Sequence, residues 1–373
     1  MDSTLFGIPN LDVIMVLGLL IGFGLMEAIS GFLASTKRKS GDWIQEAGGF
    51  FALSVLIKPL MVTVVLLVGR ALFSGSLYAL GGWGLVLATC FYLFIDDLMQ
   101  YWYHRSAHEY QFLWKLHRAH HQAEEMGFFV SYRNAGLYYF LMPNLWWVGI
   151  CTFLGLGQGV ALGLILKQIV IVTSHSTISY DKPMYKSKWL SPIISVLERI
   201  IITPAFHHSH HGKSMVDSIS DPNGNFGNMF SIWDQVFGTA KFTKEFPTEY
   251  GLQNDPKEHW TTSYFYPLVS TDDKNSEMSR GYIKQSTMTN EPIEVKLEKG
   301  EKYLYCQCGK SKNAPFCDSS HQGSKIKPLL FEAKRTGTVR LCNCKKTGTS
   351  PFCDDTHLKL VGKAEKTEVM SKV

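Results

Sequence analysis

The stretch "YWYHRSAHEYQFLWKLHRAHHQ", residues 101–122, carries five of the 13 histidines of this 373-residue chain. They fall into a pair spaced i, i+4 and a triple spaced i, i+3, i+4. The five are His104, His108, His117, His120 and His121. Residues at these spacings share one face of an α-helix. The stretch therefore predicts two helical segments, each of which directs its imidazoles toward a single point.

A second stretch, "TPAFHHSHHG" at 203–212, repeats the triple with His207, His210 and His211. His208 turns away from that face if the segment is helical, so it is either a tenth ligand or a neighbour that hydrogen-bonds the site. His175 ends an apolar run and completes the set. Neutral imidazole suits iron, zinc and copper. Nine or ten imidazoles are too many for one ion, so they predict a centre of two metal ions.

Apolar runs that approach or reach the ~20 residues needed to cross a bilayer precede these clusters. They cover residues 11–34, 49–69, 78–99 and 137–174, and the last is long enough for two passes with a turn at 155–159. The N-terminus lacks the basic region of a secretory signal, so we expect the first run to be retained as a membrane segment.

The loop "TKRK" at 36–39 lies between the first two runs, and the positive-inside rule places it in the cytoplasm. The ends of the third run and of the 137–174 hairpin then return to the same side, where ten of the histidines lie. We therefore predict a multi-pass integral membrane protein, in a bacterial inner membrane or the endoplasmic reticulum. Its histidine site and C-terminal region face the cytoplasm.

Composition separates an apolar part before about residue 205 from a polar, lysine-rich part after about 240. Overall 46% of residues are hydrophobic and 18% charged, with a formal net charge of +5. The lysines are interspersed with acidic residues, as on an ordinary solvated surface, and no nucleic-acid-binding motif is present. We expect no nucleic-acid partner.

The histidine pattern resembles the fatty acid hydroxylase/sterol desaturase superfamily of membrane di-iron oxygenases. "DLMQYWYHR" (97–105), "TPAFHHSHH" and "NFGNMFSIWDQVFGT" (225–239) match its motifs, and the alkylglycerol monooxygenase-like branch is the most similar. Two departures are Ser176-Thr177 after His175, and Phe226 in place of a tyrosine. The resemblance implies an all-α membrane helical bundle with a cytoplasmic, helical, histidine-rich di-metal cap. It also implies two iron ions, O2 as co-substrate and a lipid substrate such as a sterol, fatty acyl chain or ether lipid.

Polar residues beside the histidines are candidates for a supporting role. Asp97, near the end of the third run, is expected either to reach interfacial water or to accept a hydrogen bond from a ligand histidine. The resemblance adds Asn225, Trp233 and Asp234 as further residues that support the metal site.

Six cysteines form an internal repeat in the polar part of the chain. "CQCGKSKNAPFCDSSH" (306–321) and "CNCKKTGTSPFCDDTH" (342–357) share the spacing C-x-C-x8-C-x3-H, 36 residues apart. The ligand sets are Cys306, Cys308, Cys317 and His321 in the first copy, and Cys342, Cys344, Cys353 and His357 in the second. Three thiolates and one imidazole could hold zinc or an iron–sulfur cluster.

The "PFCD" and histidine of each copy resemble the CDGSH family, which binds a [2Fe–2S] cluster through three cysteines and one histidine. Here "CDSSH" and "CDDTH" replace the eponymous sequence. The resemblance implies two [2Fe–2S] clusters. Segments 292–306 and 329–342 each alternate around a turn, which predicts a small β-rich tandem iron–sulfur domain.

These features predict four segments: a di-iron domain at 1–268, a flexible linker at 269–290, a tandem cluster domain at 291–366 and a tail at 367–373. The favoured function is an oxidoreductase, a membrane di-iron lipid monooxygenase or desaturase. Its fused domain would pass electrons from an external reductase or ferredoxin-like donor. Two alternatives are the same enzyme with the cluster domain as a redox or iron sensor, and a non-catalytic membrane metal-handling protein.

Overall fold

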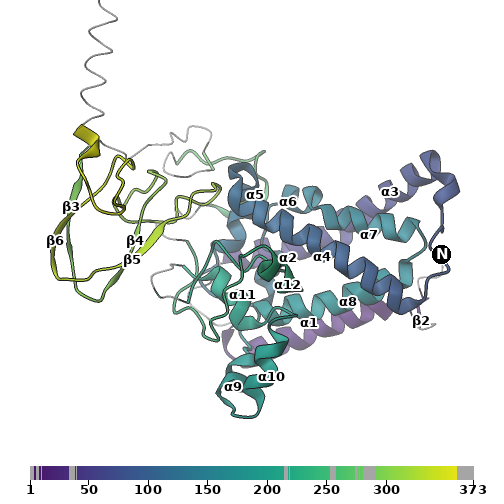
Figure 1. Ribbon diagram of the computed structural model, residues 1–373. Coiled ribbons are helices and arrows are strands. Elements are labelled where there is room, and N and C mark those ends of the chain that lie inside the picture. Colours follow the sequence, from purple (N-terminus) through teal and green to yellow (C-terminus); the bar gives the residue numbers. More distant parts are fainter. Residues whose placement is uncertain are drawn as a thin grey trace, which may run out of the picture.

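The computed structural model describes residues 4–5, 8–9, 11–32, 38, 40–213, 217, 219–252, 258–273, 276, 278–279 and 291–358. A helical part comes first and a small β-domain follows it (Figure 1). This order agrees with the predicted helical bundle and β-rich C-terminal domain. Most of the predicted linker 269–290 and all of the tail 367–373 lie outside the described residues.

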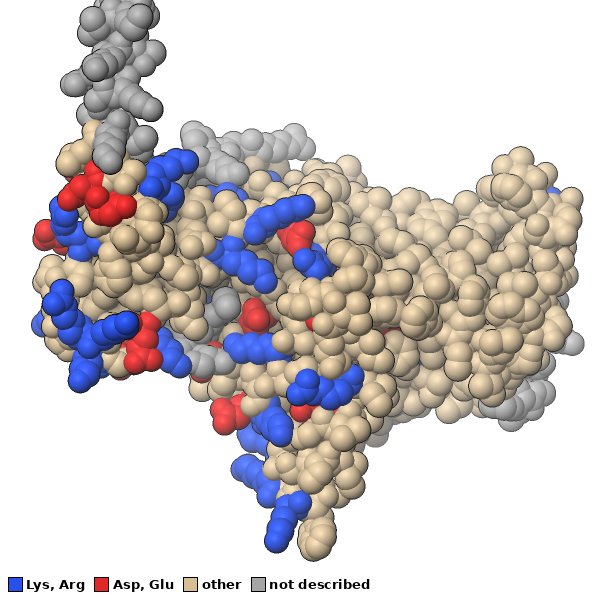
Figure 2. Space-filling view, in the orientation of Figure 1, with Lys and Arg blue, Asp and Glu red and all other residues tan. Residues whose placement is uncertain are grey.

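Long helices packed side by side form the bundle. α1 contacts α8, α3 contacts α7, and α4 contacts both α7 and α8. The elements are α1 (Leu11–Ile29), α2 (Ser40–Phe51), η2 (Ala52–Ile57), α3 (Lys58–Leu72), α4 (Leu85–Glu109), α7 (Pro143–Phe153) and α8 (Gly157–His175). In Figure 2 charged residues gather over the cap and the β-domain, while this face of the bundle is almost free of them. Apolar side chains such as Leu67 (62% exposed) and Val86 (75%) point outward, as expected for a surface that lipid covers.

Two helices in the described part of the chain are long and apolar enough to cross a membrane. One is the continuous helix Ser40–Leu72, built from α2, η2 and α3, and the other is Gly157–His175. α7 has only 11 residues, about 16 Å of helix, which is short of a ~30 Å hydrocarbon core. The two helices of the predicted hairpin 137–174 therefore differ in length, because α7 starts only at Pro143 whereas α8 has 19 residues. The five-span arrangement stays a prediction.

A cap of shorter helices closes the end of the bundle opposite the N-terminal turn (Figure 1). α4 runs without interruption past the predicted end of the third run, so its last two turns carry His104 and His108. Tyr110 then takes an extended conformation and begins α5. The remaining elements are α5 (Gln111–His121), η4 (Phe128–Tyr132), α6 (Gly136–Leu141), α9 (Asp181–Lys186), α10 (Leu190–Leu197), α11 (Pro204–His211), α12 (Ile232–Val236) and α13 (Trp260–Tyr264), with η3 (Ser74–Ser76), β1 (Thr4–Leu5) and β2 (Ile8–Pro9) at the far end.

The β-domain pairs strands between the two repeats instead of within them. β3 (Ile293–Leu297) pairs with β6 (Gly337–Leu341), and β4 (Lys302–Tyr305) pairs with β5 (Leu329–Glu332), both antiparallel. The alternation around each turn predicted the strands, but each turn joins strands of different sheets. Two separate hairpins would bury little apolar surface. The exchanged pairing builds one core around Tyr305 and Leu341, which also includes Cys342 and Cys344 of the second cysteine loop.

Candidate metal centre

Nine of the predicted ligands come together in two buried groups. A five-histidine group consists of His104, His108, His117, His121 and His210, and a four-histidine group consists of His120, His175, His207 and His211. Within each group the candidate ligand atoms lie within 4.8 Å of one another. Helices α4, α5, α8 and α11 supply them. The i, i+3, i+4 triples divide between the groups, so one helix face serves both metal positions.

The start of α11 is set by Thr203 and Pro204, which are residues favoured at the beginning of a helix. Thr203 is its N-cap, with the hydroxyl accepting from the backbone N–H of Phe206 at 3.4 Å, and Pro204 occupies the first turn. Proline is favoured there because its missing N–H has no helical partner. A carboxylate oxygen of Asp181 accepts from the N–H of Ala205 at 2.7 Å. These contacts set the start of α11, and hence the rotation that turns His207, His210 and His211 inward.

Backbone carbonyls determine the tautomers of His104 and His210. His104 Nδ1 lies 2.9 Å from the oxygen of Phe226, and His210 Nδ1 lies 2.7 Å from the oxygen of Gly224. A carbonyl can only accept, so each Nδ1 carries the proton and each Nε2 presents a lone pair. The two Nε2 atoms are 3.1 Å apart. Two lone pairs at this distance repel unless a cation lies beside both, which is the arrangement of metal-ligating histidines.

The four-histidine group is arranged in the same way. His120 Nδ1 donates to the oxygen of Val130, and His175 Nδ1 donates to the oxygen of Ile171, both at 2.8 Å. Their Nε2 atoms lie 3.5 Å apart, and the Nε2 of His207 lies 2.9 Å from that of His175. The Nε2 atoms of His120 and His175 therefore also converge as acceptors, and the Nε2 of His207 lies beside them.

Burial keeps the imidazoles neutral and leaves several of their nitrogens without partners. The buried Nε2 atoms of His108, His117 and His121 have no hydrogen-bond partner among the described residues. Burial lowers the pKa of His104 to about 4. Burial, followed by the neighbouring histidines, holds the pKa of His121 well below its usual range. A set of neutral, convergent imidazoles fits first-row transition metals, including iron.

His208 lies outside both groups although it sits in the middle of α11. Its Nδ1 is 2.8 Å from the hydroxyl of Tyr250, and its ring packs edge-on against Phe246. His208 is therefore placed neither among the clustered ligand atoms nor in a hydrogen bond to one of the nine histidines, and its role stays a prediction.

Asp97 does not contact a histidine. Its two carboxylate oxygens accept from the backbone N–H groups of Met229 and Phe230, each at 2.9 Å. The hypothesis that Asp97 holds a ligand histidine directly is therefore wrong. Asp97 instead holds the loop whose Phe226 carbonyl orients His104. The reason is position, because Asp97 lies seven residues before His104 on α4, about two turns away along the helix.

The segment 225–239 is the frame for that loop. Asp234 accepts from the N–H groups of Phe226 and Gly227, each at 2.7 Å, and burial raises the pKa of Asp234 to about 6. The Asn225 amide donates to the oxygen of Phe206 at 2.8 Å, which ties the loop to α11. Trp233 packs in a cluster with Tyr101 and Phe226. All three predicted supporting residues thus act on the backbone whose carbonyls orient His104 and His210.

Three supporting residues carried no recognisable signal in the sequence. Asn134 Oδ1 accepts from Nδ1 of His117 at 2.8 Å, from the turn before α6. Gln322 Oε1 lies 3.3 Å from Nδ1 of His108, and Asn223 contacts His321. Each partner is separated in sequence from the histidine that it contacts, so no local spacing marks the pair.

A cavity of about 130 Å³ borders both groups. His104 and His117 line it from one group, and His120, His175 and His207 line it from the other. The rest of the lining combines apolar and polar side chains. Apolar lining comes from Leu53, Tyr138, Tyr139, Met142, Leu145, Val148, Leu164 and Ile171, and polar lining from Lys58, Tyr92, Asp96, Gln100, Asn134, Asn144, Lys167 and Gln168, among others.

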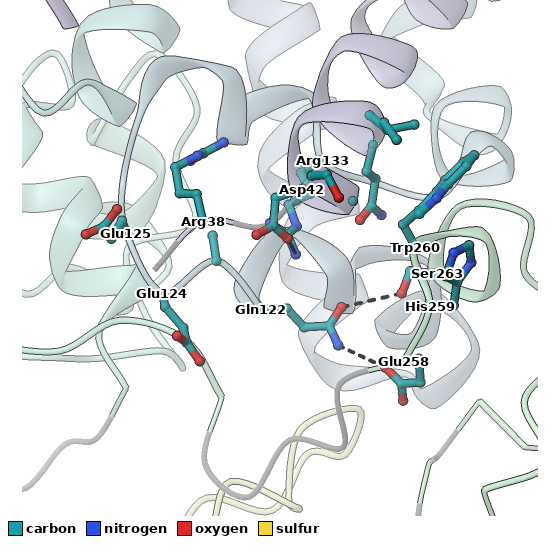
Figure 3. A pocket seen from close by; sticks show the side chains of 15 residues that line it. Arg38, Asp42, Gln122, Glu124, Glu125, Arg133, Glu258, His259, Trp260 and Ser263 are labelled. Atoms are coloured by element: carbon teal, nitrogen blue, oxygen red, sulfur yellow. Dashed lines mark hydrogen bonds and ion pairs between the residues drawn. The ribbon is translucent and has the colours of Figure 1, made fainter. Parts of the chain in front are cut away.

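A larger hollow of about 620 Å³ lies elsewhere (Figure 3). No histidine of either group lines it, and some of its polar and charged residues bind one another. Arg133 Nη2 lies 2.7 Å from Asp42 Oδ1, and Gln122 Nε2 donates to Glu258 at 3.0 Å. This hollow lies between α2, the end of α5 and the segment before α13, and it does not contain the candidate centre.

The two cysteine loops have matching backbone contacts. Cys306 N–H donates to the oxygen of Pro315 at 2.9 Å, and Cys317 N–H donates to the oxygen of Leu304 at 2.7 Å, which brings the two ends of the first motif together. His321 Nδ1 lies 3.2 Å from the sulfur of Cys317. The hydrogen bond with the Cys308 thiol lowers the pKa of Cys306 to about 5, against the effect of burial, which raises it. A thiolate at neutral pH is the metal-binding form.

The second loop repeats the arrangement. The N–H of Cys342 donates to the oxygen of Pro351, and the N–H of Cys353 donates to the oxygen of Arg340, each at 2.9 Å. His357 Nδ1 lies 3.4 Å from the sulfur of Cys353. Asp355, which the sequence did not single out, joins Cys353 and His357 in a cluster of possible ligand atoms. All six cysteines are free thiols. Both loops therefore present the thiol and imidazole donors that a [2Fe–2S] cluster takes.

Comparison with known proteins agrees with both halves of this description. The fatty acid hydroxylase family matches residues 89–239, and the CDGSH-type iron-binding zinc finger family matches 280–322. Alkylglycerol monooxygenase of Caenorhabditis elegans is 28% identical over 165 residues, covering 43% of this chain and 29% of that protein. Methylsterol monooxygenase 2-1 of Arabidopsis thaliana is 26% identical over 227 residues, covering 57% of this chain and 79% of that protein.

The β-domain is similar to the mitochondrial CDGSH iron-sulfur domain-containing protein 3 of Mus musculus. The two are 51% identical over 47 residues, which is 12% of this chain and 34% of that protein. The chain spans less than a third of the alkylglycerol relative and about a third of this one. Both resemblances seen in the motifs are thus confirmed at the level of domains. The chain combines a region that matches the fatty acid hydroxylase family with a C-terminal region that matches the CDGSH-type iron-binding zinc finger family.

Proposed function

We propose that this protein is a membrane-bound, O2-dependent di-iron oxygenase that oxidises a lipid C–H bond. The observation that carries the proposal is the pair of buried histidine groups whose neutral Nε2 atoms converge beside one cavity. Two irons held by the five- and four-histidine groups would supply the O2 activation that no side chain can perform. The family match and the two monooxygenase relatives support this reaction class.

The chain's own residues would orient the ligands and exclude water. Carbonyl oxygens of Gly224, Phe226, Val130 and Ile171 hold the Nδ1 protons, so each of the four imidazoles presents its Nε2 to the metal. Burial of all nine histidines keeps bulk water from competing at the reacting carbon.

The cavity favours an amphiphilic lipid as substrate. Its alkyl part would lie against Leu145, Val148 and Leu164, with the reacting carbon near the histidines. The buried ion pair of Lys167 with Asp96 lines the same cavity and offers a polar contact to a substrate hydroxyl or ether oxygen. We propose a sterol, fatty acyl or ether lipid on this basis. The apolar faces of Ser40–Leu72 and Gly157–His175 would place the cavity mouth within reach of the bilayer.

The β-domain would hold two [2Fe–2S] clusters and pass electrons to the histidine site. An external reductase or ferredoxin-like protein would reduce it from the cytoplasmic side, which the basic loop 36–39 favours. Covalent attachment keeps the carrier at high local concentration near its acceptor.

Metal and acid-labile sulfide analysis of protein purified without oxygen tests both centres together. We expect six irons per chain, two in the histidine groups and two in each cluster, with four sulfides and no zinc. Zinc without sulfide would make the cysteine loops zinc sites and remove the built-in electron carrier. Four irons with four sulfides would contradict the di-iron centre.

Oxygen uptake separates catalysis from metal handling. Reduced protein in detergent should consume O2 faster after a lipid extract is added, and an oxidised lipid should appear in proportion. A lipid-independent rate with no product would favour the metal-handling alternative.

A further inference from the structure

The first cysteine loop is docked directly on the histidine-bearing part of the chain. The N–H of Gly323 donates to the carbonyl oxygen of His108 at 3.0 Å, at the end of α4. Gly323 has φ +71, and a β-carbon there would come within 2.8 Å of the Cα of Gln111. Glycine is required both by this conformation and by the close approach. The contact therefore depends on residues immediately after the ligand His321.

Asn223 joins the first loop to the five-histidine group. The Nε2 of His321 lies 3.2 Å from Asn223 Oδ1 and 3.0 Å from its Nδ2. With Nδ1 facing Cys317 as the cluster ligand, Nε2 carries the proton and donates to Oδ1. The next residue, Gly224, accepts from Nδ1 of His210 at 2.7 Å. One hydrogen bond, one peptide link and a second hydrogen bond thus connect a cluster ligand to an iron ligand.

Gln322 makes a second connection at the same interface. Its Oε1 lies 3.3 Å from Nδ1 of His108, so the amide oxygen accepts and leaves Nε2 of His108 to face the metal. Gln322 is 3% exposed. A residue of the β-domain thereby orients a ligand in the helical domain.

The second loop lacks the equivalent residue. Leu358 follows His357 where Gln322 follows His321, and Leu358 is 63% exposed. In the described part of the chain, His357 makes no hydrogen bond to the helical domain. The repeats match in ligand spacing but differ at the position that docks, so they are not interchangeable.

Tyr305 links the two loops. Its hydroxyl donates to the oxygen of Cys342 at 2.6 Å, and it precedes Cys306 in the chain. Lys345 lies over the Tyr305 ring, 4.4 Å from the centroid, and its Nζ donates to the same Cys342 oxygen at 3.3 Å. The covalent and hydrogen-bonded connection therefore runs from the second loop, through the first, to His210.

We propose that the two loops act in a fixed order, in which the first loop is the terminal electron donor to the five-histidine group and the second loop is the earlier station. Asn223 is the positioning residue for transfer, and Gln322 is the positioning residue for His108. This inference rests on the proposed oxygenase function. It adds the direction of transfer and the residues that carry it.

The transfer moves one electron at a time. Cys306, Cys308, Cys317 and His321 would hold the cluster that gives up one electron, and the five-histidine group would hold the ferric iron that takes it up and is reduced to the ferrous state. Two transfers supply the two electrons that join O2, two protons and a C–H bond to give a C–OH group and water. The electrons come from the external reductase or ferredoxin-like protein, which is oxidised by one electron each time.

Anaerobic flash reduction measures this step without O2 or lipid. Full-length protein with ferric iron in the histidine groups is photoreduced by a flavin donor, and the recovery of oxidised cluster absorbance is followed. We expect a first-order rate independent of protein concentration. Asn223→Ala should slow it about 10-fold or more, Asn223→Asp should retain most of it, and Leu358→Ala should leave it unchanged. The backbone contacts of Asn223 with Asp221 and Lys327 do not involve its side chain, so the loop should stay in place.

The outcomes distinguish the route from the oxygenase proposal. Equal rates for Asn223→Ala and the parent protein, with iron and sulfide contents unchanged, would overturn the route. Fast transfer in the parent and slow transfer in Asn223→Ala would support it even if no lipid is ever oxidised, in which case only the oxygenase proposal fails.

Electron spin relaxation tests the order of the loops without depending on Asn223. Cys353→Ser removes a ligand of the second loop, so only the cluster of the first loop should form. Cys317→Ser does the reverse, so only the cluster of the second loop should form. We expect the reduced cluster in Cys353→Ser to relax faster when paramagnetic iron, rather than zinc, fills the histidine groups, with a smaller difference in Cys317→Ser. The reverse ranking, or equal differences, would overturn the proposed order.

Discussion

His207 and His208 are neighbours on α11, yet the structure gives them different surroundings. His207 Nε2 lies 2.9 Å from Nε2 of His175, and His207 belongs to the buried four-histidine group. His208 instead contacts the hydroxyl of Tyr250. On a helix adjacent residues are about 100° apart, so one of the two must leave the metal-facing side.

This difference predicts opposite effects of one substitution at adjacent positions. His207→Gln should remove a ligand and lower the affinity of the four-histidine group for iron by about 10-fold or more. His208→Gln keeps a polar group near Tyr250 and should retain the iron content of the parent. Iron per chain, measured after dialysis against a weak chelator, compares the two. Equal iron loss in both variants would make His208 a ligand.

The neutral histidines also make the metal-free protein sensitive to acid. Burial lowers the pKa of His104 to about 4 and that of His208 to about 3, whereas in the unfolded chain histidine titrates near 6.5. Between these values the unfolded state binds more protons, so the free energy of unfolding falls as pH falls through about 6.5 to 4. We expect the Tm of chelator-treated protein to be lower at about pH 5.5 than at about pH 7.5. The Tm of iron-loaded protein should fall less between the same two pH values. A Tm that does not change with pH in the stripped protein would contradict this.

At the scale of elements, α4 and α8 must approach closely to bring their histidines together. Gly159 on α8 faces α4, and a β-carbon at that position would lie 2.6 Å from the β-carbon of Ala88. Gly157, two residues earlier, has open space around it. The small residue at the crossing sets the distance between helices that carry His104, His108 and His175.

Substitution at this crossing should therefore act on the metal site from a distance. Gly159→Val should force the helices apart, lower Tm and reduce iron at both histidine groups, because overpacking costs about 1–3 kcal/mol. Gly157→Val on the same helix is the matched control and should change neither. Thermal unfolding and iron content measure both effects. A Gly159→Val protein with the Tm and iron content of the parent would show that the crossing tolerates separation.

The same elements show what the sequence could predict. The histidine spacings identified the helices that bear ligands, because three or four residues on a helix make one turn whatever the surroundings. They did not assign each histidine to its group, because that depends on how α5 and α11 rotate against each other. The strands were predictable from alternation. Their exchange between repeats was not, because strand pairing is settled by the shared core around Tyr305 and Leu341.

For the whole molecule, the position of the β-domain decides whether the two chemistries can communicate. Figure 1 shows it against the cap, at the end of the bundle that carries α5 and α11. Its contacts there include ligands or their neighbours on both sides: Gly323 with His108, and His321 with Asn223. A domain that only increased local concentration would not need such contacts between a ligand of one site and a residue next to a ligand of the other.

Enlarging the docking glycine should separate the domains while leaving both sets of ligands intact. In Gly323→Ala the new β-carbon would meet Gln111 and Trp114 on α5, so the first loop should lift away. Gly300→Ala in the turn after β3 is the control, because φ there is also positive, +87, but nothing lies nearby. Both variants incur the same kind of backbone strain. We expect Gly323→Ala alone to slow internal electron transfer about 10-fold and to weaken iron retention by releasing His108 from Gln322. If both variants slow transfer equally, strain within the β-domain explains the loss. If neither does, the docked arrangement is not the one that transfers electrons.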